Sequence, residues 1–270
     1  MIPDPEKVRF WQARARAYDA LCRRWEIFAL LSVRLIDLLP AGLQGTVLDI
    51  GGGSGLTSEL LLDRRPRCRT ILIDPTQAMV DVARVNLAGR RARCLVMGLD
   101  EAVAHDLHAD AALASVSMQF LDLEPALAVL ARVIEPGGHL AFNLWYHHWE
   151  ETADCEGMSG WLPIARAACR EAQLPPPVTP SVTPKVKTRA EMMSASERHG
   201  FQLLYEERDE DLVPVACGVE YQAMNADWPL KALPPEDRLA LLRRMHELAR
   251  GRSEPLISTR FLFRRTVQGR

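Results

Sequence analysis

Apolar residues occur in two patterns along this chain of 270 residues, one typical of strands and one typical of helices. Short apolar runs that end at glycine, proline or charged residues predict buried strands, at 46–50, 70–74, 92–97, 110–116 and 138–144. Apolar residues three and four positions apart predict helices between these runs, at about 56–64, 76–88 and 123–134. Because strands alternate with helices, the sequence predicts an α/β fold with a parallel sheet and helices on both faces. Ligands of such folds bind beyond the carboxyl ends of the strands.

The rest of the chain carries further elements. Asp4 and Pro5 stand in the preferred order for a helix start, and helical spacing continues to Leu39, so we expect two N-terminal helices. A proline-rich stretch then interrupts the alternation after the fifth strand, and we interpret it as a lid. A helix near 189–199 and a strand near 201–208 follow it. A second interruption ends in a helix over 234–250 and a strand over 258–266.

Composition narrows the functional classes. The net charge of −2, with both signs interspersed, gives no basic field, so we expect no nucleic-acid partner. The six cysteines show no C-x-x-C spacing, which is typical of free thiols in a reducing cytoplasm, and no metal cage is visible. The longest apolar stretch, 27–39, is too short and too charged to span a bilayer. We therefore expect a soluble cytoplasmic protein without a membrane contact.

The run VLDIGGGSG, residues 47–55, is the most informative motif. A glycine turn between a strand and a helix lets a ligand approach the backbone and leaves the N–H groups of the helix N-terminus free. Dinucleotides require G-x-G-x-x-G, but Leu56 or Ser58 occupies the third glycine position. Asp49 would repel a pyrophosphate and suits a cation. The motif therefore favours S-adenosylmethionine, whose methionine moiety carries an ammonium.

The same residues resemble the first motif of the class I S-adenosylmethionine-dependent methyltransferases, D-x-G-x-G-x-G, at Asp49, Gly51, Gly53 and Gly55. Asp74 ends the next strand, where the family places an acid. The segment 132–140 resembles the family's turn into the fifth strand, and 199–201 resembles the start of its sixth strand. The pair Tyr18-Asp19 resembles the pair that closes over the methionine end. The resemblance covers residues 18–144 and, more weakly, 188–208.

The resemblance implies a doubly wound Rossmann-like sheet of seven strands, mostly parallel with the last strand antiparallel, together with N-terminal helices and lid insertions. We expect one domain with four kinds of segment: an N-terminal helical cap at 1–40, a cofactor-binding core at 41–146, lid or substrate insertions at 147–187 and 210–256, and the end of the sheet at 188–209 and 257–270.

The resemblance also implies a role for each cofactor residue. Asp49 would hold the methionine ammonium, and Asp74 would accept from both ribose hydroxyls. The glycine turn would admit the ligand and Tyr18 would close over it. Four residues are expected around the adenine, namely Pro75, Met79, Leu99 and Asp100. Ser115, at the end of the fourth strand, would face the methionine. For Asp100 a solvated turn acid is an equal alternative, and Ser115 could instead pack under the sheet end.

The methyl acceptor is less defined. Enzymes of this fold that methylate base amino groups carry N/D-P-P-Y/F after the fourth strand, where this chain has SVSMQF, and the acidic cluster of a magnesium site is missing. These absences favour a metal-independent enzyme that acts on a hydrophobic small molecule. Aromatic and polar residues at the ligand end of the sheet are candidate substrate contacts, namely Trp11, Gln119, Tyr146 and Trp149.

His147 and His148 directly follow the fifth strand and are the candidate general bases, with a solvated pair as the alternative. Our main hypothesis is O-methylation of a secondary metabolite such as a polyketide. Two other classes stay open: a non-methylating S-adenosylmethionine-binding cyclase of secondary metabolism, and a non-catalytic cofactor-binding protein. The sequence leaves the oligomeric state open.

Overall fold

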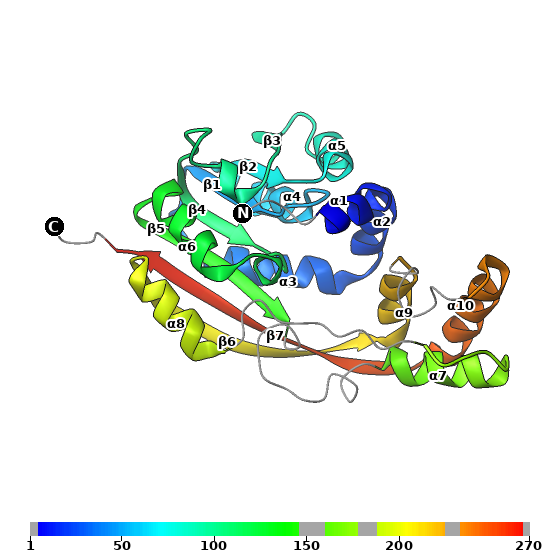
Figure 1. Cartoon of the computed structure of the whole chain (residues 1–270). Helices are drawn as coiled ribbons and strands as arrows, with labels where there is room; N and C mark the ends of the chain where they lie inside the picture. The colour runs from blue at the N-terminus through cyan, green and yellow to red at the C-terminus, as the bar shows by residue number, and fades with distance from the viewer. Residues whose placement is uncertain (1–4, 146–159, 178–187, 225–232, 267–270) are drawn as a thin grey trace. The chain divides into compact units, whose positions relative to one another are not determined.

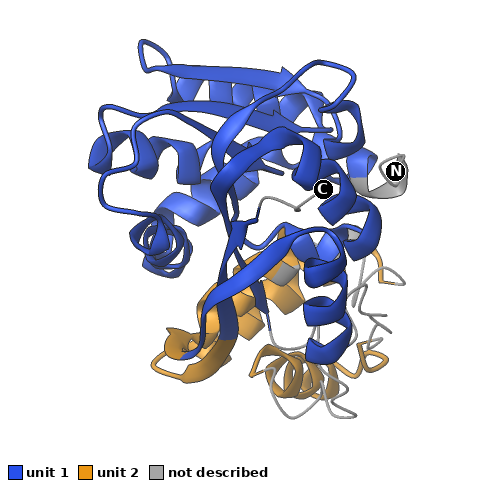
Figure 2. Ribbon diagram, turned by 90° about the vertical axis from the view of Figure 1, so that its left-hand side faces the viewer, with its two compact units in different colours: residues 1–151, 184–209, 258–270 blue, residues 152–183, 210–257 orange. Residues whose placement is uncertain are grey.

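The computed structural model describes residues 5–145, 160–177, 188–224 and 233–266. The chain divides into two compact units (Figure 2). The first unit comprises residues 1–151, 184–209 and 258–270, and the second comprises residues 152–183 and 210–257. The second unit is thus made from nearly the same two segments that the sequence sets apart as insertions.

A seven-stranded sheet with the order β3-β2-β1-β4-β5-β7-β6 organises the first unit (Figure 1). Its strands are β1 Thr46–Ile50, β2 Arg69–Asp74, β3 Ala92–Val96, β4 Ala109–Ala114, β5 Ile134–Trp145, β6 Phe201–Pro214 and β7 Ser253–Arg265. Strands β1 to β5 pair in parallel, and β7 pairs with β5 in the antiparallel sense. The predicted Rossmann-like fold is therefore confirmed. The strand order reverses between β1 and β4, which is where such sheets bind their ligands.

Helices cover both faces of this sheet, as predicted. Helices α3 Glu26–Leu38, α4 Leu56–Arg64 and α5 Gln77–Asn86 lie on one face, and α6 Leu123–Val133 and α8 Arg189–Arg198 lie on the other. Successive side chains of a strand point to opposite faces. Val47 of β1 accordingly packs with residues of α3 and α4, whereas Leu48 belongs to the cluster that includes α6 and α8.

The N-terminal segment forms three helices where the sequence predicts two. Helices α1 Pro5–Gln12 and α2 Ala15–Arg24 precede α3. Trp25 is extended, with φ −104° and ψ 113°, and it separates α2 from α3. Apolar spacing continues across Trp25, so the hydrophobic pattern does not reveal this break.

Strand ends also differ from the prediction. The fourth strand ends at Ala114, because Val116 has a φ of 55° and leaves the β region. The fifth strand begins at Ile134, four residues earlier than expected. The last two strands are longer, since β6 continues to Pro214 and β7 starts at Ser253.

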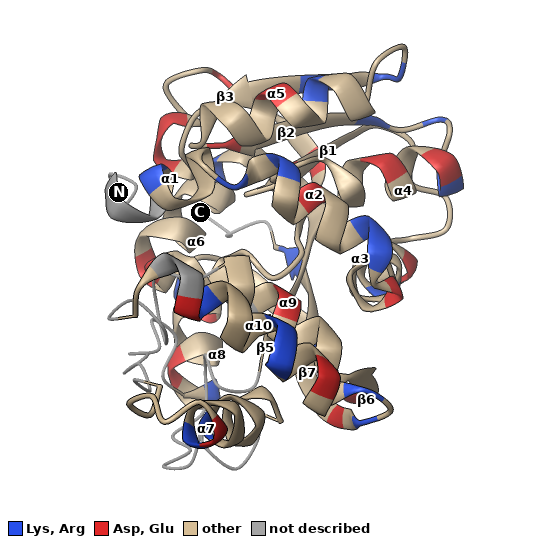
Figure 3. Cartoon of the chain, turned by 90° about the vertical axis from the view of Figure 1, so that its right-hand side faces the viewer, with Lys and Arg blue, Asp and Glu red and all other residues tan. Residues whose placement is uncertain are grey.

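The second unit contains α7 Trp161–Glu171, α9 Val215–Met224 and α10 Pro235–Ala249. These helices share an apolar core that includes Ala165, Val219 and Met245. The Glu254 carboxylate accepts the N–H of Gly160 at the start of α7, and burial raises the pKa of this carboxyl. Figure 3 shows both signs of charge on the helices of each unit. In the described part of the chain, no helix is long and apolar enough to cross a membrane.

Candidate active site

The turn between β1 and α4 has a backbone that only glycine adopts easily. Gly51, Gly53 and Gly55 have φ values of 61°, 53° and 91°. At Gly51 a Cβ would also lie 2.9 Å from the Cβ of Ser117. The turn therefore brings unshielded backbone to the carboxyl end of β1, at the point where the strand order reverses.

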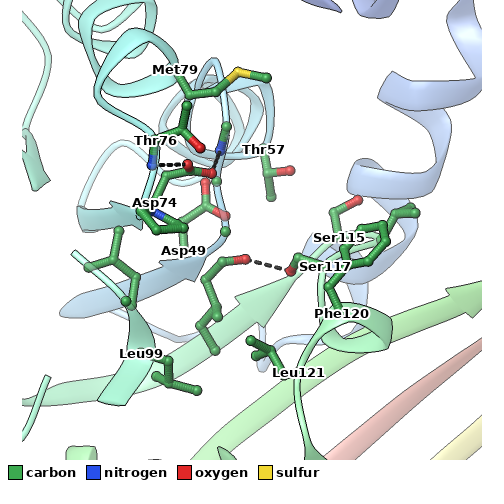
Figure 4. A pocket seen from close by; sticks show the side chains of 18 of the residues that line it. Asp49, Thr57, Asp74, Thr76, Met79, Leu99, Ser115, Ser117, Phe120 and Leu121 are labelled. Carbon is green, nitrogen blue, oxygen red and sulfur yellow. Dashed lines mark hydrogen bonds between the residues drawn. The ribbon is translucent and has the colours of Figure 1, made fainter. Parts of the chain in front are cut away.

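A cavity of about 340 Å³ in the first unit opens at this turn (Figure 4). Residues from the ends of β1, β2 and β4 and from the N-terminal helices line it. The structure brings together most of the cofactor and substrate residues inferred from the sequence, namely Trp11, Tyr18, Asp49, Gly51, Gly53, Asp74, Pro75, Met79, Leu99, Asp100 and Ser115. Gly55 belongs to the turn but is not among the lining residues. A Cβ there would meet Leu87 and Ala83, so this glycine allows α5 to pack closely.

Asp74, the last residue of β2, is buried in this cavity. Its Oδ1 accepts the N–H of Thr76 at 2.8 Å, and its Oδ2 accepts the N–H of Gly53 at 3.1 Å. Burial raises the pKa of this carboxyl, while the hydrogen bonds from Thr76 and Gly53 act in the opposite direction. Asp74 thereby ties β2 to the glycine turn and keeps free lone pairs for a ligand.

Asp49 lies beside it in β1 and is fully buried. Its Oδ2 accepts from the Ser58 hydroxyl at 2.7 Å. Burial, with a smaller contribution from the negative charge of Asp74, raises the pKa of Asp49 to about 6. No lysine, arginine or histidine is among the described residues that line the cavity. Two desolvated carboxyl groups without a nearby cation favour a positively charged ligand.

Across the cavity from these acids, hydroxyl groups form a second polar wall (Figure 4). The Ser32 hydroxyl of α3 lies 2.9 Å from the Thr57 hydroxyl of α4 and donates to Ser115 Oγ at 3.3 Å. Ser117 Oγ donates to the Ile50 carbonyl at 2.5 Å. The segment that follows β4 is thus attached to α3 and to the end of β1.

The N-terminal helices supply an aromatic wall. The rings of Trp11 and Tyr18 are 5.1 Å apart, and those of Tyr18 and Phe28 are 6.4 Å apart. The side-chain carbonyl of Gln12 accepts the N–H of Ala78, which attaches α1 to the start of α5. The sequence did not single out several apolar lining residues, namely Cys22, Phe28, Leu31, Phe120 and Leu121. Their apolar character indicates buried positions but does not distinguish a cavity wall from the core.

The remaining candidates lie apart from this cavity or outside the described residues. The Gln119 side chain is buried and accepts the N–H of Trp145 at 3.3 Å, and it is not among the lining residues. Four predicted site residues fall outside the described part of the chain, namely Tyr146, His147, His148 and Trp149. Among the described residues, no cluster of histidine, cysteine and acidic side chains could hold a metal ion.

Comparison with known proteins identifies the domain. Residues 47–138 match a family model described as a methyltransferase domain. A ribosomal RNA small subunit methyltransferase G of Frankia casuarinae is 28% identical over 211 residues, which cover 69% of this chain and 74% of that protein. A malonyl-[acyl-carrier protein] O-methyltransferase of Acetivibrio thermocellus is 28% identical over 134 residues, which cover 49% of this chain and 47% of that protein. The chain therefore matches only about half of the second relative.

A solved structure shares the fold. Geranyl diphosphate C-methyltransferase of Streptomyces coelicolor A3(2), in complex with S-adenosyl-L-homocysteine, has a TM-score of 0.51 and 14% identity, covering 88% of this chain and 79% of that chain. Residues 47–138 therefore form a methyltransferase domain of the class I S-adenosylmethionine-dependent type. S-adenosylmethionine is the cofactor of the family, and its sulfonium and ammonium charges suit a cavity that contains Asp49 and Asp74.

The first prediction concerns Asp74. Asp74→Ala removes the carboxylate that is expected to accept from the ribose hydroxyls, and it leaves the N–H groups of Gly53 and Thr76 without their partner. Calorimetric titration with S-adenosylhomocysteine should show a loss of about 2 to 3 kcal/mol, roughly 30-fold to 150-fold in affinity. Asp81→Ala, which removes an exposed carboxylate of α5, is the matched control and should bind normally. Normal binding by Asp74→Ala would refute the assignment.

The second prediction concerns the charge of Asp49 in the ligand-free protein. Its pKa of about 6 lies above the ordinary 3.8, so the folded state takes up a proton between these values and loses stability as pH rises through them. Asp49→Asn removes this loss. At pH ~8 the ligand-free variant should be more stable than the parent by at most about 3 kcal/mol, while its affinity for S-adenosylmethionine falls. Urea unfolding at two pH values tests this, and a less stable variant at both would contradict it.

Proposed function

We propose that this chain transfers the methyl group of S-adenosylmethionine to an oxygen of a hydrophobic small molecule, without a metal. The observation that carries the proposal is the composition of the cavity. Its acids, Asp49 and Asp74, lie at the glycine turn. Its other walls contain aromatic side chains such as Trp11 and Phe28 and aliphatic ones such as Leu31. The acids support the cofactor assignment, and the apolar walls support an apolar acceptor.

The chemistry requires few catalytic groups. Bound S-adenosylmethionine supplies an electrophilic methyl group on a sulfonium, and the thioether that leaves is neutral. The protein therefore needs no acid on the leaving side. Its walls contribute alignment and exclusion of water, and alignment alone is worth an effective concentration on the order of 10⁵ M or more. The polar anchors at Asp74 and Ser115 and the apolar walls are suited to this role.

The charge of the site supports a small molecule over a nucleic acid. One relative acts on ribosomal RNA, but recognition of a phosphate backbone requires lysine or arginine near the site. The described lining residues of this cavity contain neither. The oxygen acceptor and a role in secondary metabolism, for example on a polyketide, are proposals that rest on the resemblance of the sequence to its family.

We further propose that His147 or His148 is the general base and that the segments 147–187 and 210–256 form a lid over the substrate. The support is their position in the sequence, since both histidines directly follow Trp145, the last residue of β5. A base is needed only when the acceptor hydroxyl is weakly acidic. Tyr146 and Trp149 would then contact the substrate beside it.

The third prediction tests the activity itself. Incubation with S-adenosylmethionine and a panel of hydroxylated apolar compounds should yield S-adenosylhomocysteine and a product one methylene heavier than the acceptor, and EDTA should not change the rate. Asp74→Ala, which should bind the cofactor more weakly, is the low-activity control at subsaturating S-adenosylmethionine. A product isomeric with its substrate would favour the cyclase, and binding without turnover on any acceptor would favour the non-catalytic protein. Loss of turnover with EDTA, restored by magnesium, would contradict metal independence.

The fourth prediction concerns the base. If one histidine deprotonates the acceptor, its change to alanine should lower turnover by roughly 10²-fold to 10⁴-fold with unchanged affinity for S-adenosylhomocysteine. The rate of the parent should fall below a pH of about 6 to 7, where imidazole becomes protonated. Full turnover in both His147→Ala and His148→Ala would remove the histidines from the mechanism.

A further inference from the structure

A strained residue follows β4 at the wall of the cavity. Val116 lines the cavity and has a φ of 55°, in the left-handed region. Three described residues other than glycine have a positive φ, and of these Val116 alone is branched at Cβ, which makes this conformation especially unfavourable. Backbone strain of this kind persists only where surrounding contacts impose it, and such sites are often functional.

Asn143 of β5 provides the contact that holds Val116 in the left-handed conformation. The N–H of Val116 donates to Asn143 Oδ1 at 2.6 Å, and the asparagine side chain is almost fully buried. The backbone ladder between β4 and β5 ends at the pair Ala114 and Phe142. The Asn143 side chain therefore continues the hydrogen bonding between these strands beyond the last backbone pair, where the chain has already left the β conformation.

This bond fixes the direction of a carbonyl group. The peptide between Ser115 and Val116 is trans, so the Ser115 carbonyl points away from the Val116 N–H. Because that N–H is directed toward β5, the carbonyl is directed toward the β1 side of β4. Ser115 lines the cavity there, and the ladder between β1 and β4 ends earlier, at Asp49 and Leu113.

We propose that Asn143 is a positioning residue for the cofactor: it holds Val116 in the left-handed conformation and so aims the Ser115 carbonyl at the ammonium of the methionine moiety. Asn143 acts through the backbone and does not touch the ligand. Two further bonds support the same segment, from Ser32 to the Ser115 hydroxyl and from Ser117 to the Ile50 carbonyl. The proposal rests on the binding of S-adenosylmethionine in this cavity.

The test compares two ligands that differ in the methionine moiety. S-adenosylhomocysteine carries the ammonium, and 5′-methylthioadenosine lacks the whole amino-acid end. Asn143→Ala removes the acceptor of the Val116 N–H, so the segment relaxes. Calorimetry should show that S-adenosylhomocysteine binds about tenfold more weakly, which corresponds to about 1.4 kcal/mol, while 5′-methylthioadenosine binds almost as before. The ratio of the two affinities is the readout, because a general loss of folding lowers both.

Three further variants serve as controls for this test. Asn143→Asp retains an acceptor oxygen and should keep the parent's affinity ratio. The double variant Asn143→Ala/Val116→Gly should recover most of the ratio, since glycine adopts the left-handed conformation without the clamp. Ser196→Ala removes a buried hydroxyl of α8, outside the lining residues, and is the control for a buried polar deletion. If Asn143→Ala does not fold, Val116→Pro disturbs the same peptide from the cavity side and should lower the ratio similarly.

Two outcomes would overturn the proposal. One is an unchanged ratio in Asn143→Ala or, if that variant does not fold, in Val116→Pro. The other is a lowered ratio in Asn143→Ala that Val116→Gly does not restore. Failure of the parent protein to bind S-adenosylhomocysteine would instead refute the cofactor assignment, so the two failures are distinguishable.

Discussion

Two carboxyl groups, Asp49 and Asp74, are buried in one cavity at the carboxyl ends of adjacent parallel strands. A buried carboxylate is costly unless hydrogen bonds or a cation compensate it. Here Ser58, Thr76 and Gly53 supply part of this compensation. The pKa values of both acids remain raised by burial, so the compensation is incomplete without a ligand. The cavity is thus prepared for positive charge, which is the electrostatic character of S-adenosylmethionine.

The sheet determines this arrangement. Asp49 of β1 is paired with Leu72 of β2, so Asp74 lies two residues beyond that pair, level with the glycine turn. The N–H of Gly53 reaches Asp74 only because the backbone adopts positive φ values there. On the opposite side, Val116, which follows β4, donates its N–H to the Asn143 side chain of β5, and this bond shapes the other polar wall. The fold therefore presents one charged wall and one neutral acceptor wall to the same ligand.

The sequence predicts the parts of this account that depend on neighbouring residues. The carboxyl ends of β1 and β2, the glycine turn and both acids are visible because each is a local pattern of apolar, acidic and glycine residues. The break at Trp25 lies within continuous apolar spacing and is invisible to such patterns. Gly55 fits the motif, yet its close neighbours are Ala83 of α5 and Leu87, the residue that follows α5. The contact of Val116 with Asn143 joins residues 27 positions apart, so no local pattern predicts it.

The most direct test of the charged wall is the number of protons released when S-adenosylmethionine binds. Because the pKa of Asp49 is raised to about 6, this group is half protonated at that pH in the ligand-free protein, and a cationic ligand should expel the proton. Calorimetry at pH ~6 in buffers of different ionisation enthalpy should show the release of up to about half a proton per site. The release should vanish at pH ~8 and in Asp49→Asn. Binding without proton release at the lower pH, or with proton uptake, would contradict the account.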